Sequence, residues 1–502
     1  MKKKILIYLD GWFTHFGISE FLQKKYDCEL FGIVDFGKKS LDFFKNQDIV
    51  KFNNLWYYNT SLENLPKSPD IEYLSSFEER YGIDIWKLAY EDRKFYHRYN
   101  EFYKFNGDEI LSIIENECKF FESIINETKP DFYLTFYTQG HNHHLPSEIC
   151  KSKNIPVLMM SPVKFGYRMM ISEDPCHFDA DLNVDTNPSQ IPLDSFLKKH
   201  DNYEQTNQLK DVSFESKKFE RYNALLNFFL KYKINQNFHF SYYGMTKLKI
   251  IKSKIKRNYL RNKRTSFIEK NFKKDFDDEY PYIYFPLHYE PERVLFRDAY
   301  FYADQLAIIT NIAKSLPIEY KLYVKEHPMM KTIGWRDLSF YKFLMKLPNV
   351  ELVHPSIPPE KIIKNSSMVI TIASTAGQEA AFYKKPTIAF ADELYTTLPS
   401  VQRIGSMEEL PSKIRNGLST TVFEKDLENF IGKIDKKTFE FDIHAFTSDF
   451  AYRFGFKGPI MDSNLPKDEI RKFLDDHKQT LEHLADEHWK KINFFKTKQN
   501  IV

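Results

Sequence analysis

The sequence predicts an α/β protein with two domains, each built on a parallel β-sheet. The chain has 502 residues, which is longer than one hydrophobic core usually supports, so two domains are expected. Short runs rich in β-branched and aromatic residues alternate with helical patterns in two separate series along the chain. Strands separated by helices in this way pair in parallel through crossover connections.

The first series occupies roughly the first third of the chain. Strands are expected at residues 4–10, 28–35, 130–137 and 155–161, and helices at 16–25, 106–129 and 143–154. We assign residues 1–182 to an N-terminal Rossmann-like domain. Residues 183–275 are polar and then helical without strand signals, which predicts a helical, basic insertion or connection.

The second series begins at "YPYIYFPL". Strands are expected at residues 280–287, 319–328, 349–355, 367–375 and 386–391, and helices at 296–316, 338–346, 358–366 and 376–385. We assign residues 276–460 to a C-terminal Rossmann-like domain. Apolar residues at helical spacing over 467–496 predict a helix within the segment 461–502, packed back on the body of the protein.

Composition and charge exclude several classes of protein. The formal net charge is +3, so the whole chain is not a polycation and nucleic-acid binding is not expected. The four cysteines are scattered without a C-x-x-C pair, which argues against a disulfide framework or a structural zinc site. The sequence has no apolar run of 18 residues, and the one near the start is too short for a signal peptide. We therefore expect a cytoplasmic protein.

Polar side chains end the strand "EYKLYVKEHP". Lys325, Glu326 and His327 stand at its carboxyl end, and Pro328 stops the strand. In an open parallel sheet the loops at this edge line the ligand crevice. His327 can donate to a phosphate, Lys325 adds positive charge, and Glu326 can accept from hydroxyl or amino groups. The alternative is an ordinary strand-end turn with a satisfied histidine.

A second candidate site lies in "ITIASTAGQEAAF". Ser374 and Thr375 stand where a helix N-cap is expected, and Gly377 lets a ligand approach the first turn closely. The free N–H groups and the positive end of the helix dipole favour an anion there. Glu379 can reach a pair of ribose hydroxyls beside the phosphates. The alternative is helix capping alone, with Glu379 compensating the dipole.

The loop "LHYEPER" is the third strand-end loop of this domain with a polar character. It holds His288, Glu290, Glu292 and Arg293 within six residues. So many charges after a core strand are costly unless they face solvent or a ligand. Three such loops at one sheet edge predict a ligand site.

These motifs resemble the capsule polysaccharide biosynthesis family. The stretch "LYVKEHPMM…GWR…FY…LPNVELV", followed by "ITIASTAGQEAAFYKKPTIAF", carries the resemblance over about residues 280 to 395. The family includes Kdo transferases and is similar to bacterial sialyl- and polysialyltransferases. The resemblance implies a GT-B fold, in which two Rossmann-like domains face each other across a cleft and the C-terminal one holds a nucleotide-sugar.

The resemblance also implies roles for individual residues. His327 and Pro328 match the family's His-Pro motif, whose histidine contacts the nucleotide phosphate. Ser374 and Thr375 match the motif that holds the phosphate at a helix start. Glu379 matches the acidic residue that meets ribose.

The stretch before the histidine departs from the family pattern. Lys325 fits the lysine of Kdo-transferase relatives, whereas Glu326 stands where they have a proline, which leaves the donor base and sugar open.

The function implied is transfer of a sugar from a nucleotide donor to a glycan or lipid-linked acceptor, without a cofactor or a metal. A CMP-linked acidic sugar such as Kdo or sialic acid is the first choice of donor. One alternative is a polyol-phosphate transferase of the teichoic-acid type with a CDP-linked donor. Another is a non-catalytic glycan-assembly protein with a degenerate nucleotide site.

Candidates on the acceptor side come from the first domain. Asp10 and Gly11 end the first strand, and related sialyltransferases use the carboxylate of an Asp-Gly pair as catalytic base. Such a base needs a pKa raised toward neutrality. The alternative is a strand-ending Asp-Gly turn.

Two further acceptor-side candidates are less specific. His141, in "FYTQGHNHH", stands in a loop that lines the cleft or is merely solvated, and the histidine spacing there does not match a metal site. Arg168, in "KFGYRMM", can pair with a phosphate or a sugar carboxylate, or form a surface salt bridge.

The tract 247–274 is strongly basic. It carries twelve basic residues and Glu269 as its one acidic residue, with Leu248, Ile251, Ile255 and Tyr259 at helical spacing. This pattern predicts an amphipathic cationic helix. Such a helix can lie on an anionic membrane surface, which would make the protein peripheral on the inner face of the cell membrane, or bind an anionic polysaccharide. The alternative is a solvated helix.

Overall fold

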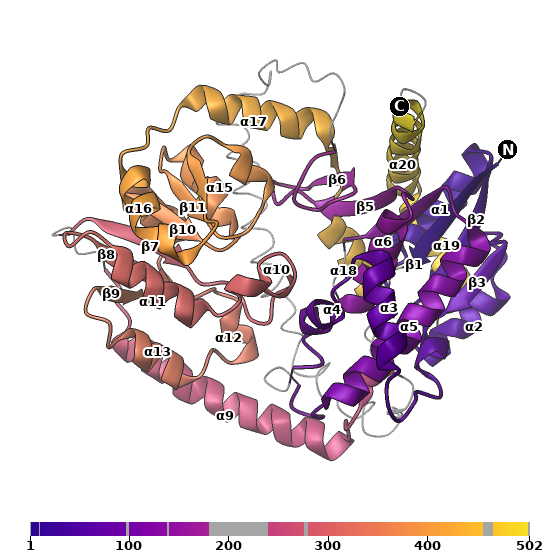
Figure 1. Cartoon of the computed structure of the whole chain (residues 1–502), viewed down its shortest axis with the longest axis horizontal. Helices are drawn as coiled ribbons and strands as arrows, with labels where there is room; N and C mark the ends of the chain where they lie inside the picture. Colours follow the sequence, from indigo (N-terminus) through magenta and orange to yellow (C-terminus); the bar gives the residue numbers. More distant parts are fainter. Residues whose placement is uncertain are drawn as a thin grey trace. The chain divides into compact units, whose positions relative to one another are not determined.

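The computed structural model describes residues 2–9, 11–96, 100–137, 140–179, 239–275, 280–454 and 465–499. These residues form two compact units. The first unit comprises the described residues up to 179, together with 239–247 and those from 437 onward. The second comprises residues 248–436. Each unit contains one β-sheet with helices packed around it (Figure 1).

The first unit has a seven-stranded sheet in the order β13-β6-β5-β4-β1-β2-β3. Strands β1 to β5 pair in parallel, and β6 and β13 are antiparallel additions at one edge. The strand order reverses between β1 and β4, which makes this the topological switch point of the sheet. The strands are β1 (Lys3–Leu9), β2 (Cys28–Val34), β3 (Asn54–Tyr57), β4 (Phe132–Phe136), β5 (Val157–Pro162), β6 (Arg168–Ser172) and β13 (Phe439–Glu440).

Helices cover both faces of this sheet. Along β1, Ile5, Ile7 and Leu9 join one apolar cluster, while Leu6 and Tyr8 join another, as the alternation of a strand requires. The helices are α1 (Thr14–Lys25), α2 (Lys38–Asn46), α3 (Ile71–Tyr81), α4 (Ile85–Glu91), α5 (Gly107–Thr128), α6 (His141–Ser152), α18 (Ile443–Phe454), α19 (Lys467–Asp476) and α20 (Lys478–Gln499), with short 3-10 turns η1 (Tyr58–Leu62) and η2 (Phe240–Tyr242).

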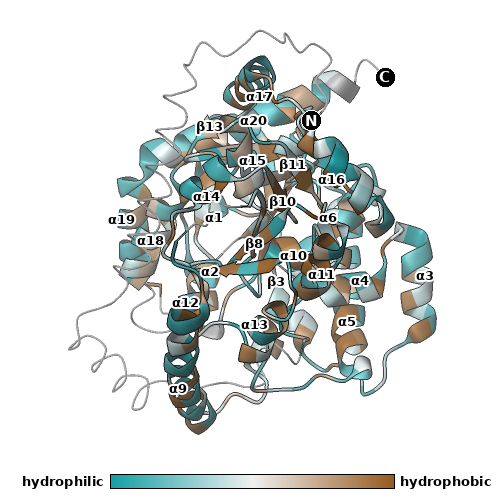
Figure 2. Cartoon of the chain, turned by 90° about the vertical axis from the view of Figure 1, so that its left-hand side faces the viewer, coloured by the Kyte–Doolittle hydropathy of each residue, from teal (hydrophilic) through white to brown (hydrophobic). Residues whose placement is uncertain are grey.

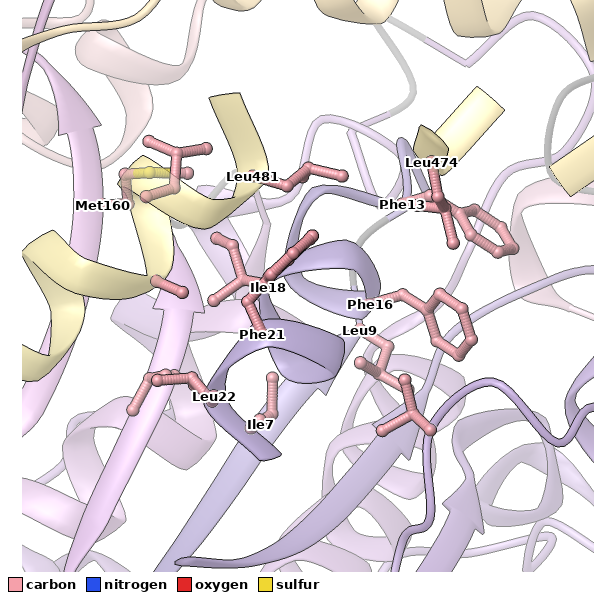
Figure 3. Close-up of a cluster of buried hydrophobic side chains, with 14 of the residues drawn as sticks. Ile7, Leu9, Phe13, Phe16, Ile18, Phe21, Leu22, Met160, Leu474 and Leu481 are labelled. Carbon is pink, nitrogen blue, oxygen red and sulfur yellow. The ribbon is translucent and has the colours of Figure 1, made fainter. Parts of the chain in front are cut away.

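The C-terminal helices pack on the first unit. Figure 3 shows Leu474 and Leu481 in one buried cluster with Phe13, Phe16 and other side chains of the N-terminal segment. Helix α1 approaches α20 so closely that a Cβ at Gly17 would lie 2.7 Å from Leu481 Cδ1. The single helix expected over 467–496 is two helices, because α19 ends at His477, whose Nε2 lies 2.9 Å from Asp449 Oδ2 of α18.

The second unit has a six-stranded sheet in the order β12-β11-β10-β7-β8-β9, with all recorded pairs parallel. This is the strand order of a Rossmann sheet, with its switch point between β7 and β10. The strands are β7 (Tyr282–Pro286), β8 (Lys321–Lys325), β9 (Val350–Val353), β10 (Met368–Thr371), β11 (Thr387–Ala389) and β12 (Val401–Arg403).

The helices of the second unit alternate with its strands. They are α9 (Lys247–Asn271), α10 (Arg293–Phe296), α11 (Gln305–Ser315), α12 (Met330–Ile333), α13 (Leu338–Leu344), α14 (Pro359–Asn365), α15 (Thr375–Phe382), α16 (Leu410–Leu418) and α17 (Glu424–Lys437), with 3-10 turns η3 (Tyr300–Tyr302), η4 (Leu394–Thr397) and η5 (Met407–Glu409). Tyr282 stacks on Tyr323 of the next strand, 4.2 Å between ring centroids, beneath α14 and α15.

The predicted α/β class with two parallel Rossmann-like sheets is confirmed. The helix expected over 296–316 is wrong in extent: α11 begins only at Gln305, because the Asp304 side chain accepts from the Leu306 and Ala307 N–H groups and caps it there.

The chain also divides differently from the expected boundaries. Residues 437–454 and 465–499 belong to the first unit, and the described part of the expected connection 183–275 ends in α9, which packs in the second. Residues 183–238 of that connection lie outside the described residues.

Candidate functional site

Three strand-end loops meet at the carboxyl edge of the second unit's sheet. They follow β7, β8 and β10, which are adjacent strands in the order β10-β7-β8. The switch point between β7 and β10 lies among them, where open α/β sheets bind their ligands. The sheet therefore brings together the three polar motifs that were predicted from the sequence.

His288 ties two of these loops together. Its Nε2 accepts a hydrogen bond from the Ala373 N–H at 3.1 Å, so the proton of the neutral ring is on Nδ1. That Nδ1 lies 3.0 Å from Glu292 Oε2 and donates to it. His288 is buried and both ring nitrogens are engaged, so it positions the loops and does not face a ligand.

Arg336 neutralises the two glutamates of these loops. Its Nε lies 2.8 Å from Glu326 Oε2, and its Nη1 lies 2.6 Å from Glu290 Oε1. Its Nη2 donates to the His288 carbonyl, and the Tyr341 hydroxyl donates to Glu326 at 2.6 Å. All five side chains are buried.

This network changes the roles expected for Glu326 and Glu290. Both carboxylates are held by Arg336, so neither is placed to accept from a substrate hydroxyl or amino group. Arg336 was not singled out from the sequence, although the quoted "GWR" contains it. The signal available in the sequence was the arginine of "GWR" close to the acidic residue Glu326 at a predicted core strand end, since a buried carboxylate needs a cation.

Lys325 differs from the charged residues around it because its ammonium group has no ion-pair partner among the described residues. The residue is 3% exposed, and its Nζ makes no hydrogen bond or ion pair with any described residue. Burial lowers its pKa to about 8, and the charges of Glu326 and Glu379 oppose that shift. A buried ammonium group without a direct partner is costly, so it marks a place where an anion is expected.

His327 follows as a neutral hydrogen-bond donor. Its Nδ1 accepts from the Met329 N–H at 3.2 Å, which leaves the ring proton on Nε2. Burial lowers its pKa to about 4, so the ring is uncharged at neutral pH. The Tyr289 ring packs edge-on against it at 6.0 Å, and Pro328 beside it is exposed. Lys325 and His327, two residues apart, thus offer a positive charge and an N–H donor at one strand end.

The start of α15 satisfies most of its own N–H groups. Ser374 Oγ accepts from the Ala376 N–H at 3.2 Å, and the Ser374 N–H donates to Thr371 Oγ1 at 3.0 Å. The N–H of Thr375, the first residue of the helix, finds no acceptor among the described residues. The loop therefore provides one open backbone donor there, fewer than the sequence predicted.

The surroundings of Gly377 and Glu379 define what each residue contacts at the start of α15. A Cβ at Gly377 would lie 2.7 Å from the Tyr395 ring, so the glycine makes room for Tyr395 and not for a ligand. Glu379 is part-buried, and its charge acts on Lys325 and Tyr284.

The acceptor-side candidates that the structure describes do not converge. Asp10 lies outside the described residues, and Gly11, two residues after the end of β1, is part-buried. His141 is buried between Asp92 Oδ2, 2.8 Å from Nδ1, and Glu117 Oε2, 2.9 Å from Nε2. Burial alone would lower its pKa, but the charge of Glu117 and the hydrogen bond to Asp92 raise it to about 10. His141 is therefore a buried cation that links α4, α5 and α6, not a lining residue.

Arg168 joins two strands at the sheet edge. Its Nε donates to Thr438 Oγ1 at 2.6 Å, and its Nη1 lies 3.8 Å from Glu440 Oε1 of β13. Sequence reasoning missed Asp35 and Asn142, which lie at the other carboxyl edge. The signal was the "CELFGIVD" strand, which ends on an aspartate as "KILIYLD" does.

Within the described residues no group of three or more His, Cys, Asp and Glu side chains is arranged to hold a metal ion. The Lys325 ammonium and the His327 N–H are donors to anions, and neither is a metal ligand in that state.

Comparison with known proteins adds a family. The family model described as "Capsule polysaccharide biosynthesis protein" matches residues 186–399. No curated protein matches the sequence significantly. Two similar solved structures are the KpsC beta Kdo 2,7 transferase of Thermosulfurimonas dismutans (12% identity, 70% of this chain and 97% of that chain, TM-score 0.28) and its beta Kdo 2,4 transferase (13%, 63% and 86%, 0.26).

UDP-GlcNAc 2-epimerase from Neisseria meningitidis bound to UDP-GlcNAc is also similar, with 12% identity over 87% of this chain and 98% of that chain and a TM-score of 0.25. TM-scores this low carry no inference about the activity of this chain. The family match includes all three strand-end loops described above. The match over residues 186–399 confirms the resemblance to the capsule polysaccharide biosynthesis family that the motifs of residues 280–395 predicted.

Proposed function

We propose that the protein is a glycosyltransferase of surface polysaccharide biosynthesis with a GT-B architecture. It binds a nucleotide-sugar at the carboxyl edge of the second unit's sheet and transfers the sugar to a glycan or lipid-linked acceptor. A CMP-linked acidic sugar such as Kdo or sialic acid is the donor that we propose. The family match supports the general assignment.

The observation that carries the proposal is the buried, unpaired ammonium group of Lys325 beside the neutral His327. When the acceptor hydroxyl attacks the anomeric carbon, the bond from that carbon to the phosphate oxygen breaks and its electron pair stays on the phosphate. The Lys325 charge and the His327 Nε2–H stabilise that developing negative charge. The Thr375 N–H is a further donor at the same sheet edge.

These donors support a reaction without a metal ion. A fixed positive charge in a dry site does for a phosphate what a bound cation does elsewhere. We therefore propose that Lys325 takes the place of a divalent cation. Glu379, whose charge acts on Lys325, is the residue that we propose for the ribose hydroxyls.

A donor screen tests the function. CMP-Kdo, CMP-sialic acid, CDP-glycerol and UDP-sugars are incubated with the protein, and release of the free nucleotide is measured for the wild type and for His327→Ala. The proposal expects turnover of a CMP-sugar that falls at least 100-fold in His327→Ala while the melting temperature changes little. Turnover of CDP-glycerol alone would favour a polyol-phosphate transferase, and wild-type turnover in His327→Ala would contradict the role of His327.

We also propose that α9 holds the protein on the anionic inner face of the cell membrane. Leu248, Ile255 and Tyr259 are 78%, 65% and 68% exposed and share one helical face. Figure 2 shows α9 as mostly hydrophilic with hydrophobic bands. On roughly the opposite face, Arg264 donates to the Gly334 and Trp335 carbonyls at 3.1 and 3.0 Å.

This arrangement leaves the apolar stripe and its flanking lysines turned away from the unit. Exposed apolar residues among basic ones are the pattern of a helix that lies in a lipid interface. Among the helices that the structure describes, none has the length and apolar character needed to cross a membrane.

A further inference from the structure

The carboxyl edge of the first unit's sheet carries its own cluster of polar side chains. Tyr8 lies near the end of β1, and Asp35 directly follows β2. Asn142 and His143 belong to the first turn of α6, the helix after β4. Because β1 and β4 are neighbours at the switch point, this cluster stands where an open α/β sheet binds a ligand.

Asp35 is the centre of the cluster. Its Oδ2 accepts from the Tyr8 hydroxyl at 3.0 Å and from Asn142 Nδ2 at 3.0 Å, and it lies 3.7 Å from His143 Nε2. Asn142 Nδ2 is also 3.3 Å from the Tyr8 oxygen, and the His143 ring packs on the Tyr8 ring at 4.4 Å.

All these contacts fall on one carboxylate oxygen. Asp35 Oδ1 accepts no hydrogen bond from the described residues, although Asp35 is only 9% exposed. Asp35 Oδ1 is not itself fully buried, so it is open to a ligand at this edge of the sheet. A polar hydrogen of a bound ligand can therefore reach it and supply the hydrogen bond that it lacks.

We propose that this cluster binds a hydroxyl group of the carbohydrate acceptor and that Asp35 is the catalytic base. The inference deepens the proposed glycosyltransferase function and rests on it. As the acceptor oxygen forms its bond to the anomeric carbon of the donor, its proton moves to Asp35 Oδ1, and the nucleotide leaves with the electron pair of the broken bond. Tyr8 and Asn142 are positioning residues, since they hold Oδ2 and leave Oδ1 open.

The electrostatics of the cluster suit this role. Burial raises the pKa of Asp35 to about 6, and the charge of Glu117 adds to the rise. The hydrogen bonds from Tyr8 and Asn142 and the charge of His141 act in the opposite direction. A base with a pKa near 6 is ionised at neutral pH and still accepts a proton effectively.

A purely structural role makes a different prediction. If Asp35 only links β1, β2 and α6, Asn at this position serves as well, because its side-chain oxygen can accept from both Tyr8 and Asn142. Asn cannot take up the hydroxyl proton. Asp35→Asn therefore separates the two roles without a change of shape.

The experiment measures nucleotide release from the donor that is turned over in the screen above, together with melting temperature and nucleotide-induced stabilisation. Asp35→Asn is expected to lower turnover 100-fold or more, with an unchanged melting temperature or a higher one and unchanged nucleotide-induced stabilisation. The matched control is Glu115→Gln, a buried carboxylate of α5 in the same unit, which should keep turnover within about threefold. Turnover of Asp35→Asn within about threefold of the wild type would overturn the proposal.

The pH profile of a second variant, Tyr8→Phe, distinguishes a catalytic Asp35 from a structural one, because a structural Asp35 would not set the pH dependence of turnover. The Tyr8 hydrogen bond lowers the pKa of Asp35, so Tyr8→Phe should shift the acidic limb of the pH profile, expected near pH 6, to higher pH. An unmoved limb would contradict the assignment. If no nucleotide stabilises the wild type, the proposed function fails and this inference fails with it. If nucleotides bind and Asp35→Asn remains active, only this inference fails.

Discussion

At the scale of single residues, the candidate nucleotide site depends on how two neighbouring charges are treated. Glu326 is buried and fully paired with Arg336 and Tyr341, whereas Lys325, one residue earlier, is buried and unpaired. The Glu326 carboxylate thus stabilises the fold, and the Lys325 ammonium group is available to bind a ligand. Functional groups that are unsatisfied in the free protein lower its stability.

The free energy of unfolding of Lys325→Met tests whether the unpaired charge of Lys325 destabilises the free protein. The pKa of Lys325 falls from 10.5 to about 8 on folding, so the folded state disfavours its charged form. The resulting cost is full below pH 8, declines between pH 8 and 10.5, and is absent above. At pH 7 Lys325→Met should therefore raise the free energy of unfolding by about 3 kcal/mol, measured by urea denaturation. A variant less stable than the wild type at pH 7 would contradict the cost that we assign to Lys325.

The pH dependence of nucleotide affinity is a second consequence of the same lysine. His327, with a pKa of about 4, keeps one state from pH 5.5 to 7.5, so affinity should be flat in that range. Above pH 8 the free protein loses the Lys325 charge, and affinity should fall by about tenfold per pH unit. Isothermal titration calorimetry with the methyl ester of CMP measures this profile, because a phosphodiester keeps one charge over this range whereas the monoester CMP titrates near pH 6. A change of affinity centred near pH 6 would point to another group of the protein.

Glu326→Gln tests the structural role of the buried pair. Removing one charge leaves the Arg336 guanidinium only partly compensated by Glu290. Breaking a buried ion pair costs about 3 kcal/mol or more. Thermal unfolding should show a lower melting temperature than for Glu360→Gln, whose carboxylate lies in an exposed pair with Lys364. Equal melting temperatures would mean that Glu326 is not a structural anchor.

At the scale of elements, α9 makes a prediction of its own. Lys252, Lys256 and Lys263 flank the exposed apolar stripe, and each basic residue near an anionic surface contributes about 1 kcal/mol. The triple change of these lysines to Glu should weaken binding to phosphatidylglycerol-containing vesicles by more than about 100-fold in a sedimentation assay.

The matched control for α9 changes net charge by the same amount elsewhere. Lys314, Lys342 and Lys346 are exposed on or beside other helices of the second unit, and their change to Glu should leave vesicle binding within about threefold. If both triple variants lost vesicle binding equally, the net charge of the protein would account for binding and α9 would not be the membrane-binding surface. No binding of the wild type to these vesicles would contradict the membrane role.

Elements with a clear pattern were predictable, and those defined by tertiary contacts were not. Strands such as β1 and β7 are continuous apolar runs, so their sequence is sufficient. The edge strand β13 has two residues and exists because it pairs with β6, and no local pattern encodes that pairing. The break between α19 and α20 depends on a contact of His477 with α18, which sequence spacing does not reveal.

The candidate site follows the same division. Parallel strands with polar carboxyl ends predicted that Lys325, His327 and Ser374 would share one sheet edge, and they do. The state of each group was not predictable, since it depends on Arg336 and Tyr395, which reach the site through the fold. Hence Glu326, Glu290 and Gly377 resembled ligand residues in the sequence and have structural contacts in the protein.

At the scale of the whole molecule, two Rossmann-like sheets each present polar residues at a switch point. One edge offers positive charge and N–H donors, and the other offers a carboxylate with a raised pKa. These are the groups needed to hold a nucleotide phosphate and to take up a hydroxyl proton.

The most direct test of the central claim is nucleotide-induced thermal stabilisation of the wild type and of Lys325→Met, with Lys321→Met at the opposite end of β8 as control. We expect CMP or another nucleotide at 100 times its dissociation constant to stabilise the wild type and Lys321→Met by about 2.7 kcal/mol and to leave Lys325→Met unshifted. Equal stabilisation of all three proteins, or of none, would contradict the assignment of Lys325 to a phosphate site.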